Sequence, residues 1–382
     1  IFNGRNFDGW EITGDSKWEV TEGAMVARPG NPEATTRGMA GSRDEFSNFI
    51  LRFQYSIEPD PNIEPENAVN SGVFFRVPRD SRRKATDGYE MEIAADDDYE
   101  YPTGSIWRLA RAYPGLSHAN LWNDAEIFAN GDFIRISVNG QVAMEIFDRR
   151  SSRGMIWFQH QRNGLVKYRN IEVMRLPESG PLPPTIEEEL EQAPGDFVSL
   201  FNGRDLAGWV AYGEVPEALP SFSVDGGEIV LEPDSGKGFL AHQGVFGDFI
   251  LKVRFMMPDD GDSREGDSGV FVRSESDGAP NGLEAQIENV RDWHHWNPTG
   301  SIYGLSQGLF GWFKFNDWNE YTIYVKGERM AVYLNGQKTA SALVGFNARA
   351  RRPFSMAGCI KIEAIEPFHR LRLRDILIKE VK

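Results

Sequence analysis

The sequence of 382 residues has almost no cysteine and no long apolar segment. Its single cysteine, Cys359, cannot form a disulfide within the chain. Free cysteine is usually buried, and no base stands beside Cys359 in the sequence, so we expect a structural position for it rather than a nucleophile. No apolar run approaches the ~18–20 residues that span a bilayer, which excludes an integral membrane helix.

Positive charge is also in short supply. Lys and Arg number 41 against 57 Asp and Glu, which gives a formal charge of −16. A polyanionic partner requires clustered Lys and Arg, so this balance argues against nucleic acid and against anionic membrane surfaces. The chain starts at Ile1 without Met or a basic and apolar leader. We expect a processed or trimmed N-terminus, which leaves export open.

What the sequence does contain is an internal repeat. The segment 1–10 reads IFNGRNFDGW, and the segment 200–209 reads LFNGRDLAGW. Further matches follow in the same order in both halves: Phe49-Ile-Leu-Arg-Phe with Phe249-Ile-Leu-Lys-Val, Ser71-Gly-Val-Phe-Phe-Arg76 with Ser268-Gly-Val-Phe-Val-Arg273, Pro102-Thr-Gly-Ser-Ile-Trp107 with Pro298-Thr-Gly-Ser-Ile-Tyr303, and Tyr168-Arg-Asn-Ile171 with Leu373-Arg-Asp-Ile376. The chain therefore consists of two copies of one domain.

The repeat predicts domains at residues 1–176 and 197–382, joined by a linker at 177–196. Prolines favour extended backbone in this linker, and its acidic stretch resists burial. We expect a semi-stiff connection in which 186–192 forms at most a short helical turn.

Within each copy the hydrophobic period is two. The segment 134–138 alternates apolar and polar residues, meets the turn dipeptide Asn139-Gly140, and continues into a second alternating segment. The segment around Asn335-Gly336 repeats this scheme. No amphipathic helix of 12 or more residues is evident. Many short strands in ~180 residues indicate an antiparallel sandwich of two sheets.

The ordered motifs of both halves resemble the bacterial 3-keto-disaccharide hydrolase domain, also described as 3-keto-glycoside 1,2-lyase or 3-keto-2-hydroxyglucal hydratase. The resemblance covers each half almost end to end. It implies an all-β chain of two tandem concanavalin-A-like jelly rolls and sugar processing in the cell envelope, hence a periplasmic or secreted protein. It also implies a saccharide as the substrate or ligand.

Strand parity predicts the working surface, because side chains at i and i+2 share a face. In 88–93, Glu90 and Glu92 share the face opposite the apolar residues, as do Glu284, Gln286 and Glu288 in 282–288. On the preceding strands the same parity places Phe74 with Arg76 and Phe271 with Arg273. We expect these side chains on the exposed face of a concave sheet, where a sugar would lie.

Two other interpretations of this pattern remain open. Any half-solvated strand shows polar residues that alternate with apolar ones. Arg76 and Arg273 could form cross-strand salt bridges with the glutamates. A direct double-displacement glycosidase is less favoured, because position 286 is Gln and the pair of carboxyls such an enzyme uses is not kept.

The two copies differ in the histidines of one loop. The second copy carries His294, His295 and Trp296 before Tyr303, whereas the first copy has Asp96-Asp97-Asp98 in the corresponding loop. Imidazole there could act as a base or bind a divalent metal, or could serve only packing. The three aspartates could hold Ca²⁺, but a solvated acidic turn explains them as well.

One departure from the family pattern concerns the Gln-Asp-His that its members often carry near the penultimate strand. The first copy has Gln159-His160-Gln161, which moves the histidine to the opposite face. The second copy has no histidine in its Glu363-Ala364-Ile365 segment. Among the aromatic residues, we expect Trp10 and Trp209 to pack in the cores, and the loop aromatics of the second copy to stack on a sugar.

The leading hypothesis is an enzyme that removes the C2 proton of a 3-keto-glycoside and expels the C1 substituent, with water addition completing hydrolysis. The base candidates are Glu284, His294 and His295, with Arg273 as the oxyanion partner. Gln286 would orient a hydroxyl, and a divalent metal is a further candidate for the ketone oxygen. The alternatives are a non-catalytic carbohydrate-binding protein and an interaction sandwich.

The copies differ where the chemistry would lie. The first copy has Glu92 in place of Gln286, and two carboxyls on one strand face should raise at least one pKa or attract a cation. We therefore expect the second copy to hold the active site and the first to support or extend it.

Overall fold

The protein was analysed as a computed structural model. It describes residues 1–31, 37–64, 68–81, 84–95, 99–178, 184–193, 195–215, 219–232, 236–257, 266–290, 295–345, 354–364 and 370–381. The chain divides into two compact units, Ile1–Pro183 and Pro184–Lys382, and each is described by itself.

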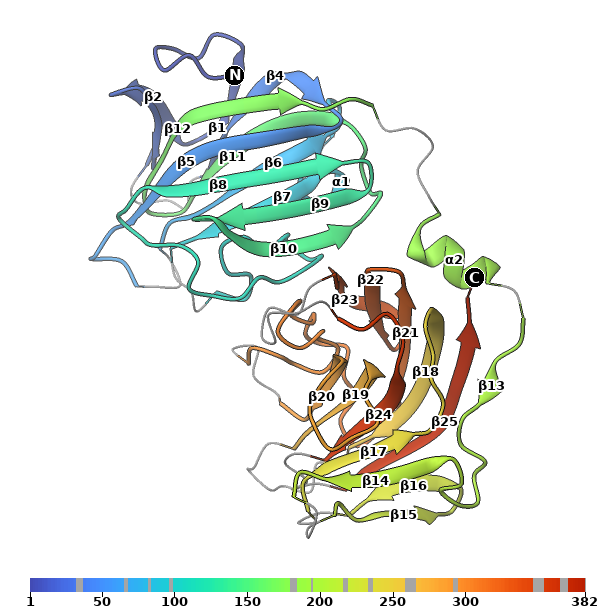
Figure 1. Ribbon diagram of the computed structural model, residues 1–382. Helices are drawn as coiled ribbons and strands as arrows, with labels where there is room; N and C mark the ends of the chain where they lie inside the picture. The colour runs from blue at the N-terminus through green and yellow to red at the C-terminus, as the bar shows by residue number, and fades with distance from the viewer. Residues whose placement is uncertain are drawn as a thin grey trace. The chain divides into compact units, whose positions relative to one another are not determined.

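The first unit is a sandwich of two antiparallel sheets (Figure 1). Its small sheet has the order β1-β4-β11-β6-β7, and its large sheet has the order β10-β9-β8-β5-β12-β3-β2. The strands are β1 (Trp10–Gly14), β2 (Lys17–Thr21), β3 (Ala24–Arg28), β4 (Arg37–Phe46), β5 (Phe49–Pro59), β6 (Asn70–Val77), β7 (Tyr89–Ala94), β8 (Asn123–Asn130), β9 (Phe133–Val138), β10 (Gln141–Phe147), β11 (Gly154–Gln161) and β12 (Gly164–Arg175), with a short helix α1 (Lys84–Asp87) before β7.

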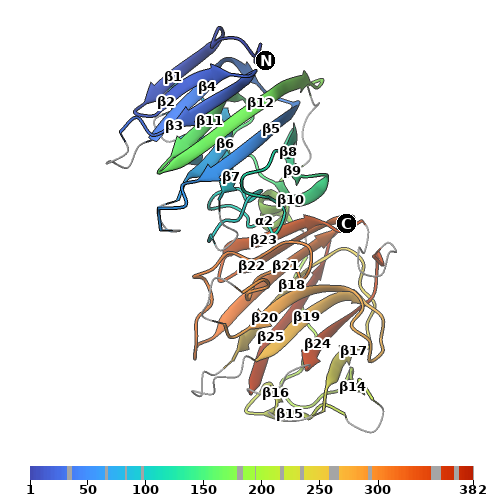
Figure 2. The same ribbon diagram turned by 90° about the vertical axis from the view of Figure 1, so that its left-hand side faces the viewer.

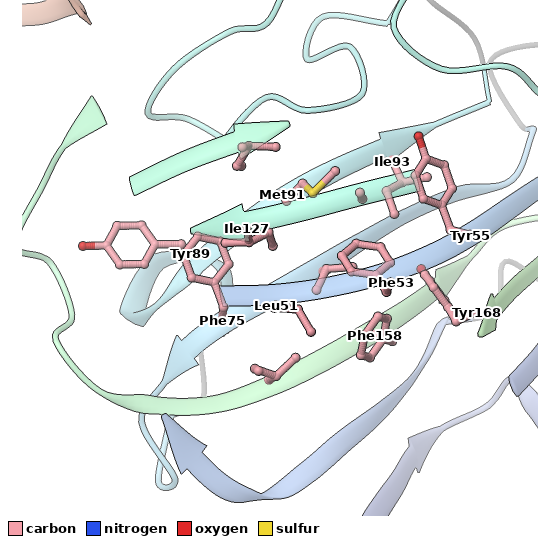
Figure 3. Packing of buried hydrophobic residues seen from close by; sticks show 14 of the residues in the cluster. Leu51, Phe53, Tyr55, Phe75, Tyr89, Met91, Ile93, Ile127, Phe158 and Tyr168 are labelled. Atoms are coloured by element: carbon pink, nitrogen blue, oxygen red, sulfur yellow. The ribbon is translucent and has the colours of Figure 1, made fainter. Parts of the chain in front are cut away.

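Alternate residues of the two sheets fill the space between them. Figure 3 shows Leu51 and Phe53 of the large sheet facing Phe75, Met91 and Phe158 of the small sheet. The rings of Phe53 and Phe158 meet edge to face with 5.5 Å between their centroids. The period-two pattern of the sequence therefore predicts this core correctly, and the residues between the core positions of the small sheet face outward.

The second unit repeats this architecture (Figures 1 and 2). Its small sheet has the order β14-β17-β24-β19-β20, and its large sheet has the order β15-β16-β25-β18-β21-β22-β23, with β13 paired to β25. The elements are α2 (Ile186–Gln192), β13 (Val198–Ser199), β14 (Trp209–Gly213), β15 (Phe222–Asp225), β16 (Glu228–Leu231), β17 (Gly238–His242), β18 (Phe249–Met256), β19 (Asp267–Ser274), β20 (Leu283–Glu288), β21 (Asn319–Lys326), β22 (Arg329–Leu334), β23 (Gln337–Leu343), β24 (Cys359–Ala364) and β25 (Leu371–Glu380).

The predicted turns and core residues are confirmed. Asn139 and Asn335 have positive φ, and each is followed by a glycine with positive φ, as a tight hairpin requires. Trp10, Trp209 and Cys359 are buried. No helix among the described residues is long and apolar enough to cross a membrane.

The acidic segment after the prolines differs from the expected linker. Helix α2 begins with a capping box in which Thr185 and Glu188 satisfy each other's backbone N–H groups. Ile186 packs against Ile250 and Tyr324 on the outer side of the large sheet. The carboxylates of this stretch stay largely exposed, as expected, and Glu187 accepts a hydrogen bond from the Tyr333 hydroxyl at 2.7 Å. Residues 184–193 therefore belong to the second unit.

Candidate functional site

The outer face of the small sheet in the second unit carries a polar cluster. Cross-strand pairing aligns Asp267 with Glu288, Gly269 with Gln286, and Phe271 with Glu284. On the other side of β19, Lys361 of β24 lies beside Phe271, which places Glu363 beside Gly269. Glu284, Gln286 and Glu288 share the face opposite the core, as predicted, but Gln286 and Glu288 are buried there and not exposed as expected. Strands β19 and β24 add residues to this face.

Three carboxylates meet over one glycine. Oxygens of Asp267, Glu284 and Glu363 all lie within 4.8 Å of one another. A Cβ atom at Gly269 would stand 2.6 Å from Oε1 of Glu284, so only glycine leaves room for this carboxylate. The glycine of the Ser-Gly-Val-Phe motif thus provides the space in which the cluster forms.

Glu363 is the most buried of the three, and burial raises its pKa to about 8. The charge of Asp267 contributes to this rise, whereas a hydrogen bond with Glu284 and the charge of Lys361 oppose it. A hydrogen bond between two carboxyl groups requires a proton on one of them, so Glu284 and Glu363 share a proton when they are in contact.

Gln286 completes the cluster. Its Nε2 donates a hydrogen bond to Oδ1 of Asp267 at 2.6 Å. The side chain is only 2% exposed, and its Oε1 is buried without a hydrogen-bond partner in the part of the chain that the structure describes. An amide oxygen in this position can still accept a hydrogen bond or bind a cation.

The predicted histidine loop reaches the same face. Nδ1 of His295 lies 2.8 Å from Oε2 of Glu288, an ion-pair distance without the alignment of a good hydrogen bond. A carboxylate next to one ring nitrogen orients the imidazole and leaves the other nitrogen for chemistry. His294, the other candidate of this loop, lies outside the described residues, as does the Asp96-Asp97-Asp98 run of the first copy.

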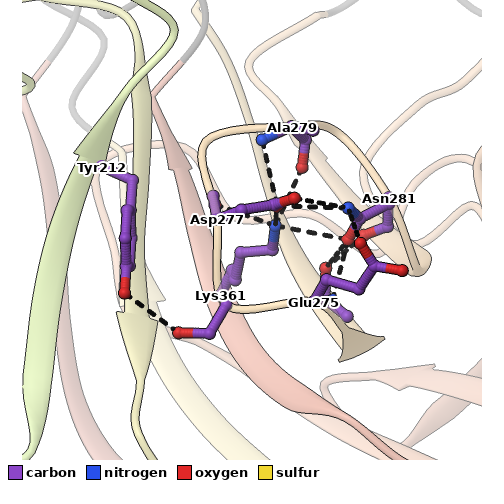
Figure 4. Close-up of polar contacts among 8 residues, drawn as sticks. Tyr212, Glu275, Asp277, Ala279, Asn281 and Lys361 are labelled. Atoms are coloured by element: carbon purple, nitrogen blue, oxygen red, sulfur yellow. Dashed lines mark hydrogen bonds and ion pairs between the residues drawn. The ribbon is translucent and has the colours of Figure 1, made fainter. Parts of the chain in front are cut away.

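A buried lysine of β24, Lys361, contacts the loop between β19 and β20 (Figure 4). Nζ of Lys361 donates to the Ala279 carbonyl at 2.8 Å and to Oδ1 of Asp277 at 3.1 Å, both in the loop between β19 and β20. The same ammonium lies 4.6 Å from the centre of the Phe239 ring. Lys361 therefore fastens this loop onto the outer face of the small sheet.

The three aromatic residues predicted to contact a sugar differ in their burial. Phe271 is buried edge to face against Phe239, with 5.3 Å between ring centroids, so it supports the face from within. Tyr303 is half-buried, and its backbone N–H bonds the carbonyl of Glu284. Trp296 is 63% exposed and could stack on a ligand at the edge of the site.

The prediction that Arg76 and Arg273 share this face is wrong. Both have a left-handed backbone, with φ of 50° and 51°, at a register shift in the small sheet. The shift breaks the alternation that the parity argument assumes. The guanidinium of Arg273 is 1% exposed and binds the Gly247 and Gly327 carbonyls and Asp248. Arg273 is thus a structural clamp for loops and not an oxyanion partner at the cluster, and Glu284 is not its ion-pair partner.

The first unit has a corresponding cluster with its charges rearranged. Glu90 and Glu92 are both buried on the outer face of β7. Nδ2 of Asn70 lies 3.4 Å from Oε2 of Glu92. Here Asn70 takes the place of Asp267, and Gln159 takes that of Glu363. The first unit therefore keeps one carboxylate of the cluster, Glu90 in the place of Glu284, and lacks the other two, while Glu92 replaces the neutral Gln286.

Burial raises the pKa of Glu90 to about 8, although the charge of Arg37 opposes this. Burial and the neighbouring Glu90 raise the pKa of Glu92 well above its ordinary value. The expected effect of two like charges on one strand is thus present. His160 points away from this face, since its Nδ1 lies 2.8 Å from Oγ of Ser16.

Sequence reasoning missed three members of the cluster: Asp267, Lys361 and Glu363. Parity within β19 could have included Asp267, which lies two residues before Gly269. Glu363 and Lys361 come from a strand about 80 residues later in the chain, and only its pairing with β19 brings them to the site. The Thr-Gly-Ser-Ile motif, by contrast, proves structural: Thr299 and Ser301 bond the backbone of Glu288 and Gln286 along the sheet edge.

The fold and this cluster define a jelly-roll sandwich protein with a buried acidic site on each small sheet. The sequence matches the 3-keto-alpha-glucoside-1,2-lyase-like domain over residues 1–174 and again over 196–379. The chain belongs to this family, with two tandem copies of its domain. It is accordingly a carbohydrate-active or carbohydrate-binding protein.

Solved structures with similar folds each correspond to about half of the chain. A candidate glycosyl hydrolase from Parabacteroides distasonis is 20% identical, with 49% of this chain and 100% of that one covered and a TM-score of 0.40. A protein of unknown function with a galectin-like fold from Bacillus subtilis is 13% identical, with 47% and 96% covered and a TM-score of 0.38. Among curated proteins, none matches the sequence.

Proposed function

We propose that the second unit cleaves or hydrates 3-keto-glycosides. A ketone at C3 acidifies the C2 proton, so a modest base can remove it. The electron pair of the C2–H bond forms an enolate. Its collapse restores the ketone, forms the C1–C2 double bond and breaks the bond from C1 to the leaving oxygen, which takes up a proton. Addition of water across C1 and C2 completes net hydrolysis.

The observation that carries the proposal is the His295–Glu288 pair on the face that also holds Glu284 and Gln286. His295 is the proposed base, since Glu288 lies beside one ring nitrogen and the side chain is one-third exposed to solvent. Gln286 and the neighbouring carboxylates supply hydrogen-bond partners for sugar hydroxyls. Trp296 offers an exposed ring at the rim.

Turnover of a 3-keto-glycoside by the full chain tests the proposal. His295→Asn should lower kcat by about 10²-fold or more, as loss of a general base does. Glu288→Gln should lower kcat less and leave binding nearly unchanged. The matched control is Glu92→Gln in the first unit, which should leave kcat within twofold. Equal turnover by His295→Asn and the unsubstituted chain would remove His295 as the base.

A binding role without turnover is the second candidate, and the exposed ring of Trp296 beside a polar cluster favours it. It predicts calorimetric binding of unmodified oligosaccharides that Trp296→Ala weakens, with no product formed. A periplasmic or secreted location belongs to the main proposal, and fractionation of the producing cells would test it.

A further inference from the structure

We propose that Asp267, Glu284, Glu363 and Gln286 form a binding site for a hard divalent cation, with Ca²⁺ as the best fit. The donor set consists only of oxygen atoms, three from carboxylates and one from an amide. Oxygen donors of this kind select Ca²⁺, Mg²⁺ or Mn²⁺ over metals that prefer sulfur or imidazole.

The spacing of the oxygens supports one shared ion. One oxygen from each carboxylate lies within 4.8 Å of the other two. Ca²⁺ binds oxygens at about 2.3–2.6 Å, so two ligands on opposite sides of the ion stand about 4.6–5.2 Å apart. Mg²⁺ requires about 2.0–2.1 Å, which brings opposite ligands to roughly 4.1 Å. Separations of 4.8 Å or less are therefore compatible with one shared ion. Ca²⁺ is the better fit because it tolerates irregular ligand geometry, whereas Mg²⁺ requires a near-ideal octahedron and gives up its water reluctantly.

Gln286 supplies an observation that is independent of the acidic groups. Its Oε1 is buried, and a buried oxygen without a partner is costly in free energy. Its Nε2 is already committed to Asp267, which holds the amide at the edge of the cluster. Gln286 pairs with Gly269, and the Glu284 carboxylate lies over that glycine. The side chains of Gln286 and Glu284 are therefore neighbours on this face. A bound cation would give this oxygen its partner.

The ammonium of Lys361 leaves room for such an ion. Lys361 stands two residues before Glu363 on the same face of β24, yet its four hydrogen-bond contacts all go to residues 277–281. The first unit provides the contrast, because Asn70 and Gln159 replace two of the three carboxylates. The cation site is thus expected in the second unit alone.

Cation binding does not depend on the proposed reaction and can be measured without a sugar. If the reaction also holds, a cation here would sit on the face of His295 and could stabilise negative charge on a ketone oxygen. That role rests on the proposed function. Cation binding without turnover of a 3-keto-glycoside would support the cation site and contradict the proposed reaction. Turnover without cation binding would support the reaction and contradict the cation site.

Calorimetric titration of the full chain, stripped with EDTA, with Ca²⁺, Mn²⁺ and Mg²⁺ tests the site. We expect one ion per chain, with Ca²⁺ or Mn²⁺ bound more tightly than Mg²⁺. Asp267→Asn and Glu363→Gln should each weaken binding by about tenfold or more, because affinity follows the number of charged ligands. Glu90→Gln, the matched substitution for Glu284 in the first unit, should leave affinity unchanged.

A second measurement needs no variant. Crystals of the unsubstituted protein soaked in Mn²⁺ should show an anomalous peak among the carboxylates of residues 267, 284 and 363. The proposal is overturned if none of the three ions binds at up to about 1 mM, the weak end for protein Ca²⁺ sites. It is equally overturned if the peak lies elsewhere or if Asp267→Asn and Glu363→Gln both fold and bind as the unsubstituted chain does.

Discussion

At the scale of single residues, the two copies keep one hydrogen-bonded pair with its roles exchanged. In the first unit an amide, Asn70, approaches a carboxylate, Glu92. In the second unit the carboxylate is Asp267 and the amide is Gln286, in the same two strand positions. The pair itself is preserved although neither residue is, which indicates that a donor and an acceptor are needed side by side on this face.

This exchange predicts a compensating double substitution. Gln286→Glu alone places a second buried carboxylate against Asp267 and should lower the free energy of unfolding by about 1–3 kcal/mol. Asp267→Asn together with Gln286→Glu recreates the arrangement of the first unit and should recover most of that loss. Thermal unfolding in the presence of EDTA measures both. If the double substitution lowered the free energy of unfolding by the sum of the two single substitutions, the two residues would not act as a pair.

The acids of the first unit predict a dependence of stability on pH. Glu90 has a pKa of about 8 against its ordinary 4.5, and the pKa of Glu92 is raised as well. The folded state then holds protons that the unfolded state has released, so the free energy of unfolding falls as pH rises from about 5 to 8. The charge of Glu90 adds to the raised pKa of Glu92, whereas the amide of Asn70 and the positive charges of Arg37 and Arg162 moderate it.

Thermal unfolding of the first unit between pH 5 and pH 8.5 measures this effect. Glu92→Gln should flatten the curve and raise stability at the alkaline end, where the unsubstituted chain carries a buried charge. Glu126→Gln, on the outer side of the large sheet, is the control and should leave the slope unchanged. A slope that Glu92→Gln does not alter would assign the pH dependence to other groups.

At the scale of elements, the sequence predicts the strands and their faces well but not where alternation breaks. Asn139-Gly140 specifies its hairpin because few other dipeptides tolerate two positive φ angles. Arg273 continues an alternating run without any turn residue, so nothing local signals the register shift at which its backbone becomes left-handed. The shift is set by pairing with β24, a strand distant in sequence. The same distance hides Glu363, whose place in the cluster follows from pairing and not from spacing.

The loop between β19 and β20 depends on Lys361, and this predicts a local change in dynamics. Lys361→Met keeps the buried stem but removes every hydrogen bond to the loop. Global stability should change little, because the Asp277 side chain is 43% exposed and water can solvate the carboxylate that loses its partner. The amide protons of Glu275 and Ala279, now bonded to Asn281 and Asp277, should exchange faster by about tenfold or more.

Hydrogen exchange of the full chain checks this, with Lys326→Met on the large sheet as the control. Protection of β18 and β21 should stay as in the unsubstituted chain, since their bonds do not involve the loop. Unchanged exchange in 275–281 would mean that turn bonds within the loop, not Lys361, hold it in place.

Helix α2 predicts that the second unit begins before the boundary indicated by the repeat. Ile186 is buried against the large sheet, and Lys338 pairs with Glu187 at 2.9 Å. Ile186→Ala should cost about 2 kcal/mol, which lowers the Tm of the second unit by roughly 4–8 °C. Val198→Ala, at a highly exposed position just after the helix, should have almost no effect. Equal Tm values for the two variants would show that α2 adds nothing to the unit.

At the scale of the whole molecule, duplication has produced two complete cores and two unequal sites. Each unit has its own cluster of buried apolar residues, so each is expected to fold alone. Only the second places a histidine beside a glutamate on the outer face of its small sheet, within the part of the chain that the structure describes. Function resides in such a site and not in the fold, so one copy can lose chemistry without losing its packing.

This asymmetry predicts how activity divides when the units are expressed separately. Residues 184–382 should turn over a 3-keto-glycoside with kcat close to that of the full chain. The proposed base His295 and the polar residues on its face, Glu284, Gln286 and Glu288, all come from this unit. Residues 1–183 should fold, as far-UV circular dichroism and a cooperative melt would show, but form product at least about 10²-fold more slowly, the size of the missing base's contribution. An equimolar mixture of the two halves should equal the second half alone. If the first half turned over the sugar as fast as the full chain, its Glu90 and Glu92 would have to supply the chemistry, and the division of labour between the copies would be wrong.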